Sequence, residues 1–372
     1  MSPSRVEKES SISVQPITHP ADKLCKMGAV VTGVDLNSLS DEDLQVLKEA
    51  TYKYKVIIIK AQHDLEPINQ WNLVTRLDPT APQIYGHGSM EQFKKTGGML
   101  SQYNVSCIPS APTVRLIGKG YQGPDNYGVK DFHAVGPSND FHAYPPTEEA
   151  FEAGNTQFQR WHMDAPLYER DPPHFTTLRA IKLPVGPDLT VNWDDGSGLS
   201  MKAKPGQTAF YSDTQLYEML NEEEKMLADN SWVEYAPHPY KWVENCKGNT
   251  NGLGILTQCK EHTLEELPEY DEALVKTYPF VWKTPLGEKS LQVHGLGVRK
   301  LFLKRSPSSE VEVIEDLVKI REVLSNLQYR ILRPEYIFLP PVEEGDVQMW
   351  DNWAVFHSAI DYPLKYGIRS EY

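Results

Sequence analysis

The stretch Trp161-His162-Met163-Asp164 is decisive for the fold and the chemistry, because it places an imidazole and a carboxylate two residues apart. In an extended segment, side chains at positions i and i+2 point to the same face. One strand could therefore present a nitrogen and an oxygen ligand side by side. That is two thirds of the 2-His-1-carboxylate set that holds non-haem Fe(II). Because His-x-Asp often arises by chance, the rest of the chain must supply a third ligand.

Composition narrows the class of protein. The chain has 372 residues, of which 40% are hydrophobic and 24% charged, and its formal net charge is −14. These values are typical of a globular protein, and the negative charge argues against nucleic acid or an anionic membrane as a partner. The four cysteines are far apart and form no C-x-x-C pair. Reduced thiols and the lack of an apolar leader predict a cytoplasmic protein, whereas the oligomeric state stays open.

The order of segments predicts a mainly β fold with helical additions. Residues 1–22 are polar and predict a flexible tail, and residues 23–372 predict a single domain. Short apolar segments separated by turns favour an antiparallel jelly roll, a double-stranded β-helix. We expect strands at residues 113–117, 160–165, 176–183, 189–193, 208–211, 232–235, 253–256, 290–293 and 347–350. Helices are predicted after Ser40, at residues 66–77, after Asn221 and at residues 311–327.

Three histidines compete for the place of third ligand. His238 lies between two prolines, which disturb strand pairing, and His294 follows a short strand. His357 lies in a late predicted strand, and Arg369 follows twelve residues further on. A late strand that returns beside the first, with a fixed cation for a dicarboxylate, favours His357, so His294 is the second choice. His174 and His238 are interpreted as structural.

The pattern His162-x-Asp164, His357 and Arg369 resembles the taurine-dioxygenase-like family of Fe(II)/2-oxoglutarate-dependent dioxygenases. The resemblance extends over residues 28–372 and includes Trp350-Asp351-Asn352. It implies that His162, Asp164 and His357 bind Fe(II), and that Arg369 and Thr190 bind the cosubstrate 2-oxoglutarate, with O2 as oxidant. The implied activity is oxidation of a small molecule.

Within this family the sequence is most similar to fungal xanthine dioxygenases, through residues 233–240, 252–254, 282–283 and 291–294. Such relatives carry a lysine ahead of the His-x-Asp motif, where this chain has Asn139, and the nearest lysine is Lys130. The framework favours xanthine or a related heterocycle as substrate, and the missing lysine favours a tailoring oxidation of a secondary metabolite. The acidic residues Glu148, Glu149 and Glu152 form either a solvated helix face, the favoured interpretation, or a contact to a heterocycle.

The end of the chain adds a third alternative. Relatives continue through a further strand after the arginine, whereas this chain ends at Tyr372, three residues past Arg369. We therefore expect the last strand to be missing and Arg369 to lie on a loose end. A truncated jelly-roll binding protein without activity is the alternative from another class.

Overall fold

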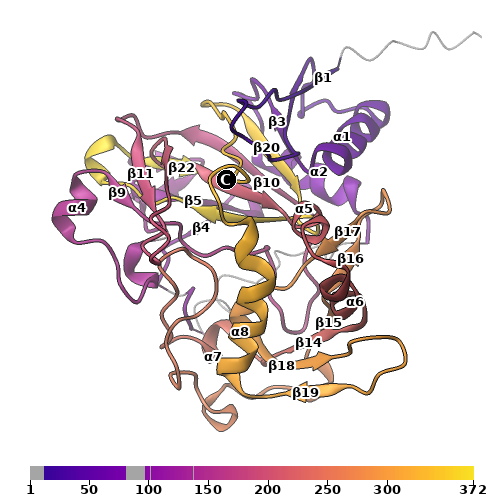
Figure 1. Cartoon of the computed structure of the whole chain (residues 1–372). Coiled ribbons are helices and arrows are strands. Elements are labelled where there is room, and N and C mark those ends of the chain that lie inside the picture. The colour runs from indigo at the N-terminus through magenta and orange to yellow at the C-terminus, as the bar shows by residue number, and fades with distance from the viewer. Residues whose placement is uncertain (1–11, 81–96, 101, 137) are drawn as a thin grey trace, which may run out of the picture.

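The computed structural model describes residues 12–80, 97–100, 102–136 and 138–372. The first eleven residues of the expected tail at residues 1–22 therefore lie outside the described part. Within its remainder, Ser13–Pro16 form a strand that pairs with Ala29–Thr32, so this part is not the expected flexible tail. The described residues form a mostly β structure with peripheral helices (Figure 1). None of the described helices is long and apolar enough to cross a membrane. All four cysteines, Cys25, Cys107, Cys246 and Cys259, are unpaired.

The largest sheet has nine strands and carries the N-terminal helices on one face. Its strands, in spatial order, are β1 (Ser13–Pro16), β2 (Ala29–Thr32), β3 (Val56–Ile59), β20 (Val347–Asp351), β10 (Phe175–Lys182), β22 (Arg369–Glu371), β5 (Ala111–Tyr121) and β4 (Ser106–Ile108), with β8 (His133–Ala134) beside β5. Helix α1 (Asp41–Tyr54) lies against β3 and β20, and helix α2 (Pro67–Leu77) lies against β10 and β5. Leu47 and Leu73 pack there against Ile57 and Met349.

A second layer runs across the region of the His-x-Asp motif. Strands β12 (Ser200–Ala203), β11 (Leu189–Asn192) and β9 (Asn155–Thr156) pair in that order, and β13 (Thr208–Ser212) pairs with β21 (Val355–Ala359). Single bridges, Phe158 with Ile360 and His162 with His357, join the segment after β9 to β21. Phe210 of β13 and Trp350 of β20 meet in one hydrophobic cluster, so this layer packs against the large sheet.

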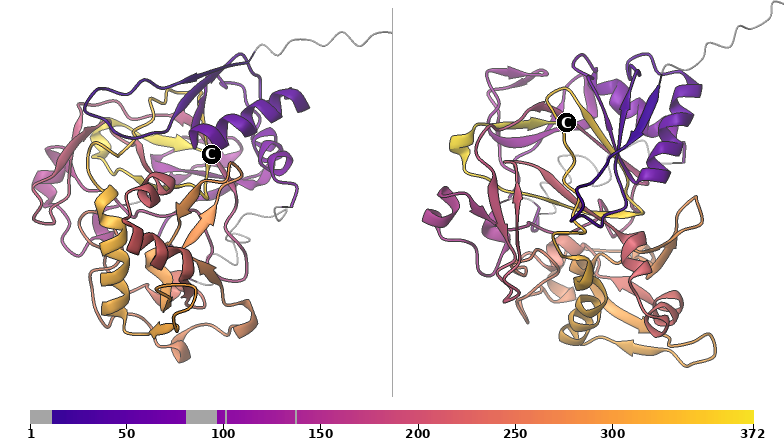
Figure 2. Two further views of the ribbon diagram at one scale, coloured as in Figure 1. Left: turned by 45° about the vertical axis from the view of Figure 1, so that its right-hand side comes forward. Right: turned by 45° about the horizontal axis from the view of Figure 1, so that its top comes forward.

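Most of the remaining elements form the lower part of Figure 1, whereas α4 (Glu148–Glu152) lies at the left beside β9 (Figures 1 and 2). The strands are β15 (Thr277–Pro279), β14 (Trp232–Tyr235), β18 (Val298–Leu303) and β19 (Glu312–Ile314) in one sheet, β16 (Val281–Lys283) with β17 (Lys289–Leu291), and, elsewhere, β6 (Asp125–Asn126) with β7 (Val129–Lys130). The helices are α4 (Glu148–Glu152), α5 (Asp213–Glu218), α6 (Glu222–Asn230), α7 (Pro239–Trp242) and α8 (Leu317–Gln328). The 3-10 turns are η1 (Asn139–Phe141), η2 (Leu264–Glu266), η3 (Glu272–Leu274), η4 (Gly295–Gly297), η5 (Tyr329–Ile331) and η6 (Leu364–Tyr366).

Capping residues account for the helix starts that the sequence predicts correctly. The Ser40 side chain accepts the N–H of Asp43, and α1 begins at Asp41. Asn221 and Glu224 form a full capping box at the start of α6. These contacts satisfy N–H groups that have no partner within the helix, so they mark its start locally.

The predicted helix at residues 311–327 is wrong in its first third. Residues Glu312–Ile314 form β19 and pair with β18, and α8 begins only at Leu317. Asp316 caps it, because its carboxylate accepts the N–H groups of Val318 and Lys319. The β-branched side chains of Val313 and Ile314 suit a strand once a partner strand is present.

Two predicted strands are also wrong. Residues 160–165 hold one isolated bridge, and residues 253–256 form a turn with a single bridge between Gly248 and Ile255. Around residues 113–117 the sequence predicts too little, since β4, β6, β7 and β8 accompany the longer strand β5. Short strands whose partners are distant in sequence leave a weak local pattern.

Candidate metal centre

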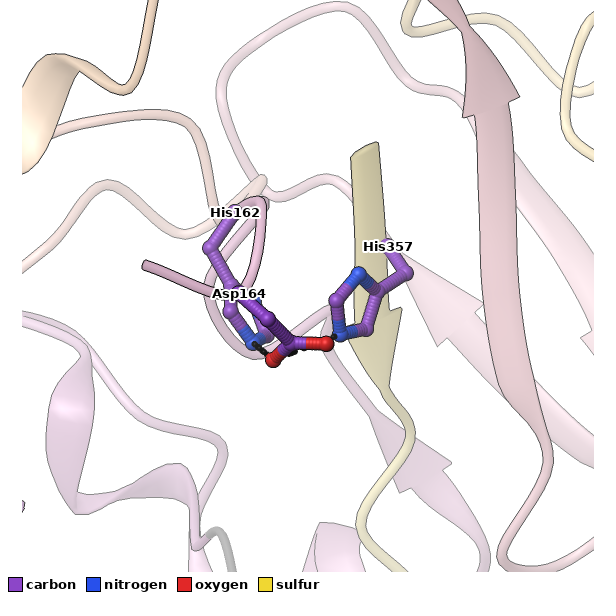
Figure 3. Close-up of side chains that lie close together, drawn as sticks. All are labelled: His162, Asp164 and His357. Atoms are coloured by element: carbon purple, nitrogen blue, oxygen red, sulfur yellow. Dashed lines mark ion pairs between the residues drawn. The ribbon is translucent and has the colours of Figure 1, made fainter. Parts of the chain in front are cut away.

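His162, Asp164 and His357 lie together in the second layer (Figure 3). Each offers one ligand atom, and these atoms lie within 4.8 Å of one another. Nε2 of His357 is 3.6 Å and Nε2 of His162 is 3.9 Å from Oδ1 of Asp164. The side chain of Asp164 is 33% exposed and that of His357 only 9%. Solvent therefore reaches this group of three side chains from the side of the carboxylate.

Main-chain pairing brings the two halves of this group together. The N–H of His162 donates to the carbonyl of His357 at 3.0 Å, and the N–H of His357 donates back at 2.9 Å. The N–H of Trp161 turns away instead and donates to Gly252. Because the bridge between His162 and His357 is isolated and no neighbouring residue extends it into a ladder, this stretch is not the expected strand. Side chains still alternate. Trp161 and Met163 are buried in a cluster with Tyr211, Val233 and Leu324, called the outer hydrophobic cluster, while His162 and Asp164 meet His357.

Neighbouring groups orient the ligands. Nδ1 of His162 lies 2.8 Å from the carbonyl of Arg160, so this nitrogen carries the proton and Nε2 keeps its lone pair. Oδ2 of Asp164 is buried and has no hydrogen-bond partner among the described residues. Two imidazole nitrogens near one oxygen of a carboxylate, whose other oxygen lacks a hydrogen-bond donor, form a donor set that fits a divalent transition metal.

The protonation states also suit a metal. Burial lowers the pKa of His162 well below its ordinary value, and the neighbouring His357 and Arg160 lower it further. Burial opposes ionisation of Asp164, but interaction with His357 outweighs it and keeps the pKa of the carboxyl well below its usual range. At neutral pH His162 is therefore neutral and Asp164 ionised, the forms that bind metals.

The second-choice ligand, His294, lies next to this group but outside it. Its ring centroid is 6.3 Å from that of His162, and the residue is completely buried. Neither ring nitrogen has a hydrogen-bond partner among the described residues, and burial lowers its pKa to about 3. His174, by contrast, stacks on Trp353 at 4.2 Å and faces Asp351 at 3.3 Å, as expected for a structural residue.

Arg369 is held inside the large sheet and not on a loose end. Its strand, β22, pairs with β10 on one side and β5 on the other. Nη2 of Arg369 donates to Oγ1 of Thr208 at 3.2 Å and lies 2.7 Å from Oε2 of Glu371. Thr208 is two residues before Phe210, the pairing partner of His357, so the guanidinium reaches the face of β13 and β21 that carries His357.

Thr190 and the acidic residues lie elsewhere. The Thr190 hydroxyl accepts a hydrogen bond from Nζ of Lys202 at 2.7 Å, and it can still donate its own proton. Glu148, Glu149 and Glu152 are exposed on α4. Their exposure agrees with a solvated helix face.

Sequence reasoning assigned no role to two residues that the structure places at the site. Asn352, fully buried, bonds both main-chain polar groups of Asp164 at 2.8 Å and the carbonyl of Pro173 at 2.8 Å. Arg160 is 6% exposed and precedes the motif by one i, i+2 step. Arg160 could have been found from its spacing, because it lies two residues before His162 and four before Asp164. The sequence around Asn352 gives no sign of its contact with Asp164.

Comparison with known proteins identifies the family of this chain. The family described as "Taurine catabolism dioxygenase TauD, TfdA family" matches residues 13–369. The alpha-ketoglutarate-dependent dioxygenase bsc9 of Alternaria brassicicola is 43% identical, over 99% of this chain and 94% of that protein. The alpha-ketoglutarate-dependent xanthine dioxygenase xanA of Emericella nidulans is 40% identical, over 94% of this chain and 92% of that protein.

Solved structures show the same fold at much lower identity. A taurine dioxygenase from Burkholderia xenovorans superposes with a TM-score of 0.54 at 17% identity, covering 97% of this chain and 89% of that one. AAD-2 in complex with Mn(II) and N-oxalylglycine superposes with a TM-score of 0.53 at 16% identity, covering 97% and 95%. The chain belongs to the TauD/TfdA family and is an alpha-ketoglutarate-dependent dioxygenase, which uses Fe(II), 2-oxoglutarate and O2.

Proposed function

We propose that His162, Asp164 and His357 hold the iron of this enzyme. The observation that carries the proposal is the convergence of two Nε2 atoms and one carboxylate oxygen within 4.8 Å, from segments almost two hundred residues apart. Bound iron would supply the oxidation of substrate, coupled to decarboxylation of 2-oxoglutarate to succinate and carbon dioxide. The protein residues orient the ligands, hold the cosubstrate and exclude water from the buried side.

Arg369 is the proposed anchor for the far carboxylate of 2-oxoglutarate. A guanidinium matches a carboxylate with two parallel N–H groups, and Nε of Arg369 is buried without a hydrogen-bond partner among the described residues. Thr208 and Glu371 direct the side chain towards the face of His357. Thr190 is proposed to donate a hydrogen bond to the same cosubstrate.

The proposed architecture is one double-stranded β-helix domain comprising residues 23–372, to whose largest sheet β1 (Ser13–Pro16) is added, acting in the cytoplasm. The packing of β13 and β21 against the large sheet, through Phe210 and Trp350, supports a jelly roll. The TauD/TfdA relatives among solved structures support it as well.

The proposed substrate is a small polar molecule, with xanthine or a related heterocycle as the first candidate. The likeness to proteins named xanthine dioxygenases supports this choice. Asn139 favours the second candidate, a tailoring oxidation of a secondary metabolite. It stands where those relatives are expected to carry a lysine, and its Oδ1 accepts a hydrogen bond from Gln159 at 3.1 Å. Lys130 is not a simple substitute for the lysine expected at position 139, because it forms an ion pair with Asp125.

Succinate release from 2-oxoglutarate, with Fe(II) and ascorbate under air, tests the reaction. Xanthine is then added, and loss of its absorbance with formation of urate identifies it as substrate. If xanthine neither stimulates succinate release nor is consumed, the result favours the tailoring oxidation of a secondary metabolite. An enzyme that forms no succinate, alone or with any candidate substrate, contradicts the proposed reaction. No observation on the described residues or the relatives favours an inactive binding protein.

A further inference from the structure

Arg160 is a buried cation without a carboxylate partner among the described residues. It is 6% exposed, its Nη2 donates to the hydroxyl of Tyr103 at 3.2 Å, and its Nη1 meets Sδ of Met99 at 3.8 Å. A guanidinium has five N–H donors, so the described part of the chain leaves most of them without an acceptor. A buried charge is costly unless it is paired.

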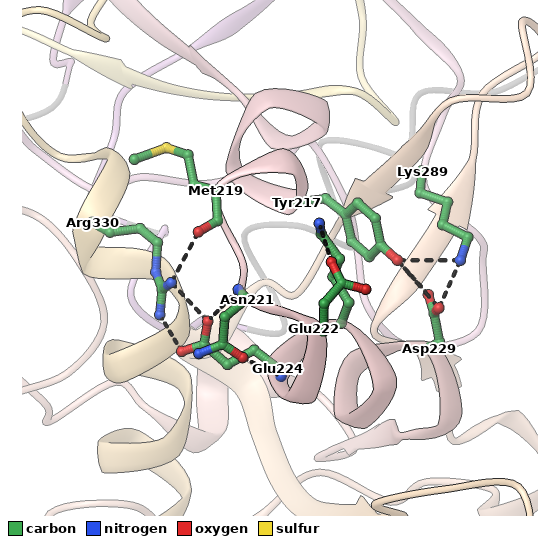
Figure 4. Close-up of polar contacts among 9 residues, drawn as sticks. Tyr217, Met219, Asn221, Glu222, Glu224, Asp229, Lys289 and Arg330 are labelled. Atoms are coloured by element: carbon green, nitrogen blue, oxygen red, sulfur yellow. Dashed lines mark hydrogen bonds and ion pairs between the residues drawn. The ribbon is translucent and has the colours of Figure 1, made fainter.

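Arg330 shows the ordinary arrangement for comparison (Figure 4). Its two terminal nitrogens bind the Glu224 carboxylate at 2.8 and 2.6 Å, and the Met219 carbonyl accepts another bond at 3.2 Å. Arg330 is thus neutralised by its own chain, although it is more exposed than Arg160.

The position of Arg160 links this charge to the metal centre. Arg160, His162 and Asp164 alternate with Trp161 and Met163, which are buried in the outer hydrophobic cluster. The side chain of Arg160 therefore leaves the main chain on the same side as the two ligands. Its positive charge contributes to the lowered pKa values of His162 and His294, as a nearby cation does. The rings of Tyr103 and Phe141 lie 5.6 and 5.9 Å from its Cζ.

His294 is a second polar group on this side that lacks a partner. Its main-chain N–H donates to the hydroxyl of Tyr235 at 3.1 Å, but neither ring nitrogen is bonded within the described structure. The ring packs among His162, Tyr240 and Phe356. Because no hydrogen bond holds the ring, turning it towards a ligand breaks none.

We propose that Arg160 binds an oxyanion of the substrate and that His294 turns to add a second hydrogen bond, so that the enzyme selects small anionic substrates. The shared chemistry is an oxygen that carries delocalised negative charge. It belongs either to an acid group or to a deprotonated oxo-heterocycle. This inference rests on the proposed iron site, because it places the anion beside His162 and Asp164.

The test measures binding of two probes to the full-length protein with Fe(II) and 2-oxoglutarate, without oxygen, by calorimetry. Xanthine represents the heterocycle and taurine the acid group. Wild type is expected to bind at least one of them, and Arg160→Gln to weaken that binding by about ten- to a hundredfold, as for a charged hydrogen bond. Arg160→Lys keeps the charge but loses the planar fork, so an intermediate loss is expected. Arg330→Lys is the matched control and should bind the probe as wild type does.

Three outcomes overturn the inference. In the first, wild type would bind neither probe at millimolar concentration. In the second, Arg160→Gln would bind the probe as tightly as wild type. In the third, Arg160→Gln loses affinity for 2-oxoglutarate as much as for the probe, which would make Arg160 a cosubstrate residue. Failure of wild type to bind Fe(II) or 2-oxoglutarate at all contradicts the proposed function instead. That failure is seen before any probe is added.

His294→Phe gives an independent test if Arg160→Gln does not fold. A phenyl ring has a similar shape and removes two buried nitrogens that lack partners, so the thermal midpoint should stay equal or rise. Probe binding should weaken by about three- to tenfold, and His294→Gln, which can donate and accept, should recover part of it. A lower midpoint together with unchanged probe affinity would show a structural role for His294 and overturn its place in recognition.

Discussion

Asn352 holds both main-chain polar groups of Asp164. Its Oδ1 accepts the N–H of Asp164 at 2.8 Å, and its Nδ2 donates to the Asp164 carbonyl at 2.8 Å. Asn352 follows β20 and precedes β21, so the turn that leads to His357 also fixes the main chain of Asp164. The relative position of two proposed metal ligands thus depends on one buried amide.

Replacing Asn352 should therefore weaken iron binding. Asn352→Ala removes three hydrogen bonds of a buried side chain and should lower the free energy of unfolding by about 2 kcal/mol. Loss of this support should also weaken Fe(II) binding by about ten- to a hundredfold, as for other groups that orient metal ligands. Denaturant titration and anaerobic Fe(II) titration measure the two effects. Undiminished Fe(II) affinity in a folded Asn352→Ala protein would contradict the positioning role.

The third ligand can be tested by comparing two histidines. His357→Ala should abolish tight Fe(II) binding, because it removes one of the three ligand atoms. His294→Ala should retain it, since His294 lies outside this group. The absorption band that forms when Fe(II) and 2-oxoglutarate are mixed without oxygen is the measurement. The reverse result would make His294 the ligand.

Glu371 should compete with 2-oxoglutarate for Arg369. Its carboxylate lies 2.7 Å from the guanidinium, and the pair is buried. Glu371→Gln removes the competing charge and should lower the Kd for 2-oxoglutarate by about threefold or more, because a charged acceptor binds more strongly than a neutral one.

Burial raises the pKa of Glu371, which adds a pH dependence. As pH falls through this raised pKa, the carboxyl becomes neutral and frees Arg369, so wild-type affinity should approach that of Glu371→Gln. Calorimetric titration at several pH values measures the difference. Equal Kd values for the two proteins across the range would show that Glu371 does not compete.

Asp213 should limit stability at neutral pH. It is fully buried at the start of α5, neither carboxylate oxygen has a hydrogen-bond partner among the described residues, and burial raises its pKa well above the ordinary value. The folded state therefore retains a proton that the unfolded state loses above about pH 4. The contribution of Asp213 to the free energy of unfolding is therefore greatest below that pH, and it falls by about 1.4 kcal/mol per pH unit as pH rises towards the folded pKa.

Asp213→Asn should remove this decline and raise the free energy of unfolding at pH 7. Urea denaturation between pH 5 and 8 is the measurement. Asp229→Asn serves as the control, because that carboxylate is bound by Lys289 at 2.6 Å and by Tyr217 at 3.0 Å, so its loss should bring no gain (Figure 4). Parallel pH profiles for wild type and Asp213→Asn would contradict the assignment.

Local features are what the sequence by itself determined. The i, i+2 spacing of His162 and Asp164 placed two candidate ligands on one side of the chain, and Ser40 and Asn221 marked two helix starts, because spacing and capping involve only near neighbours. His357 was predicted from its distance to Arg369 and from the resemblance, and the structure places it beside the motif.

Contacts between distant segments were decided only by the tertiary structure. Residues 312–314, predicted as helix, form β19 because they pair with β18. Residues 160–165, predicted as a strand, form only the single bridge from His162 to His357. Two further features also depend on contacts between distant segments. They are the hydrogen bond between Asn352 and Asp164 and, in the described structure, the lack of a carboxylate beside Arg160. Their energies depend on which groups meet in a buried environment, and that is set by the packing of the whole chain.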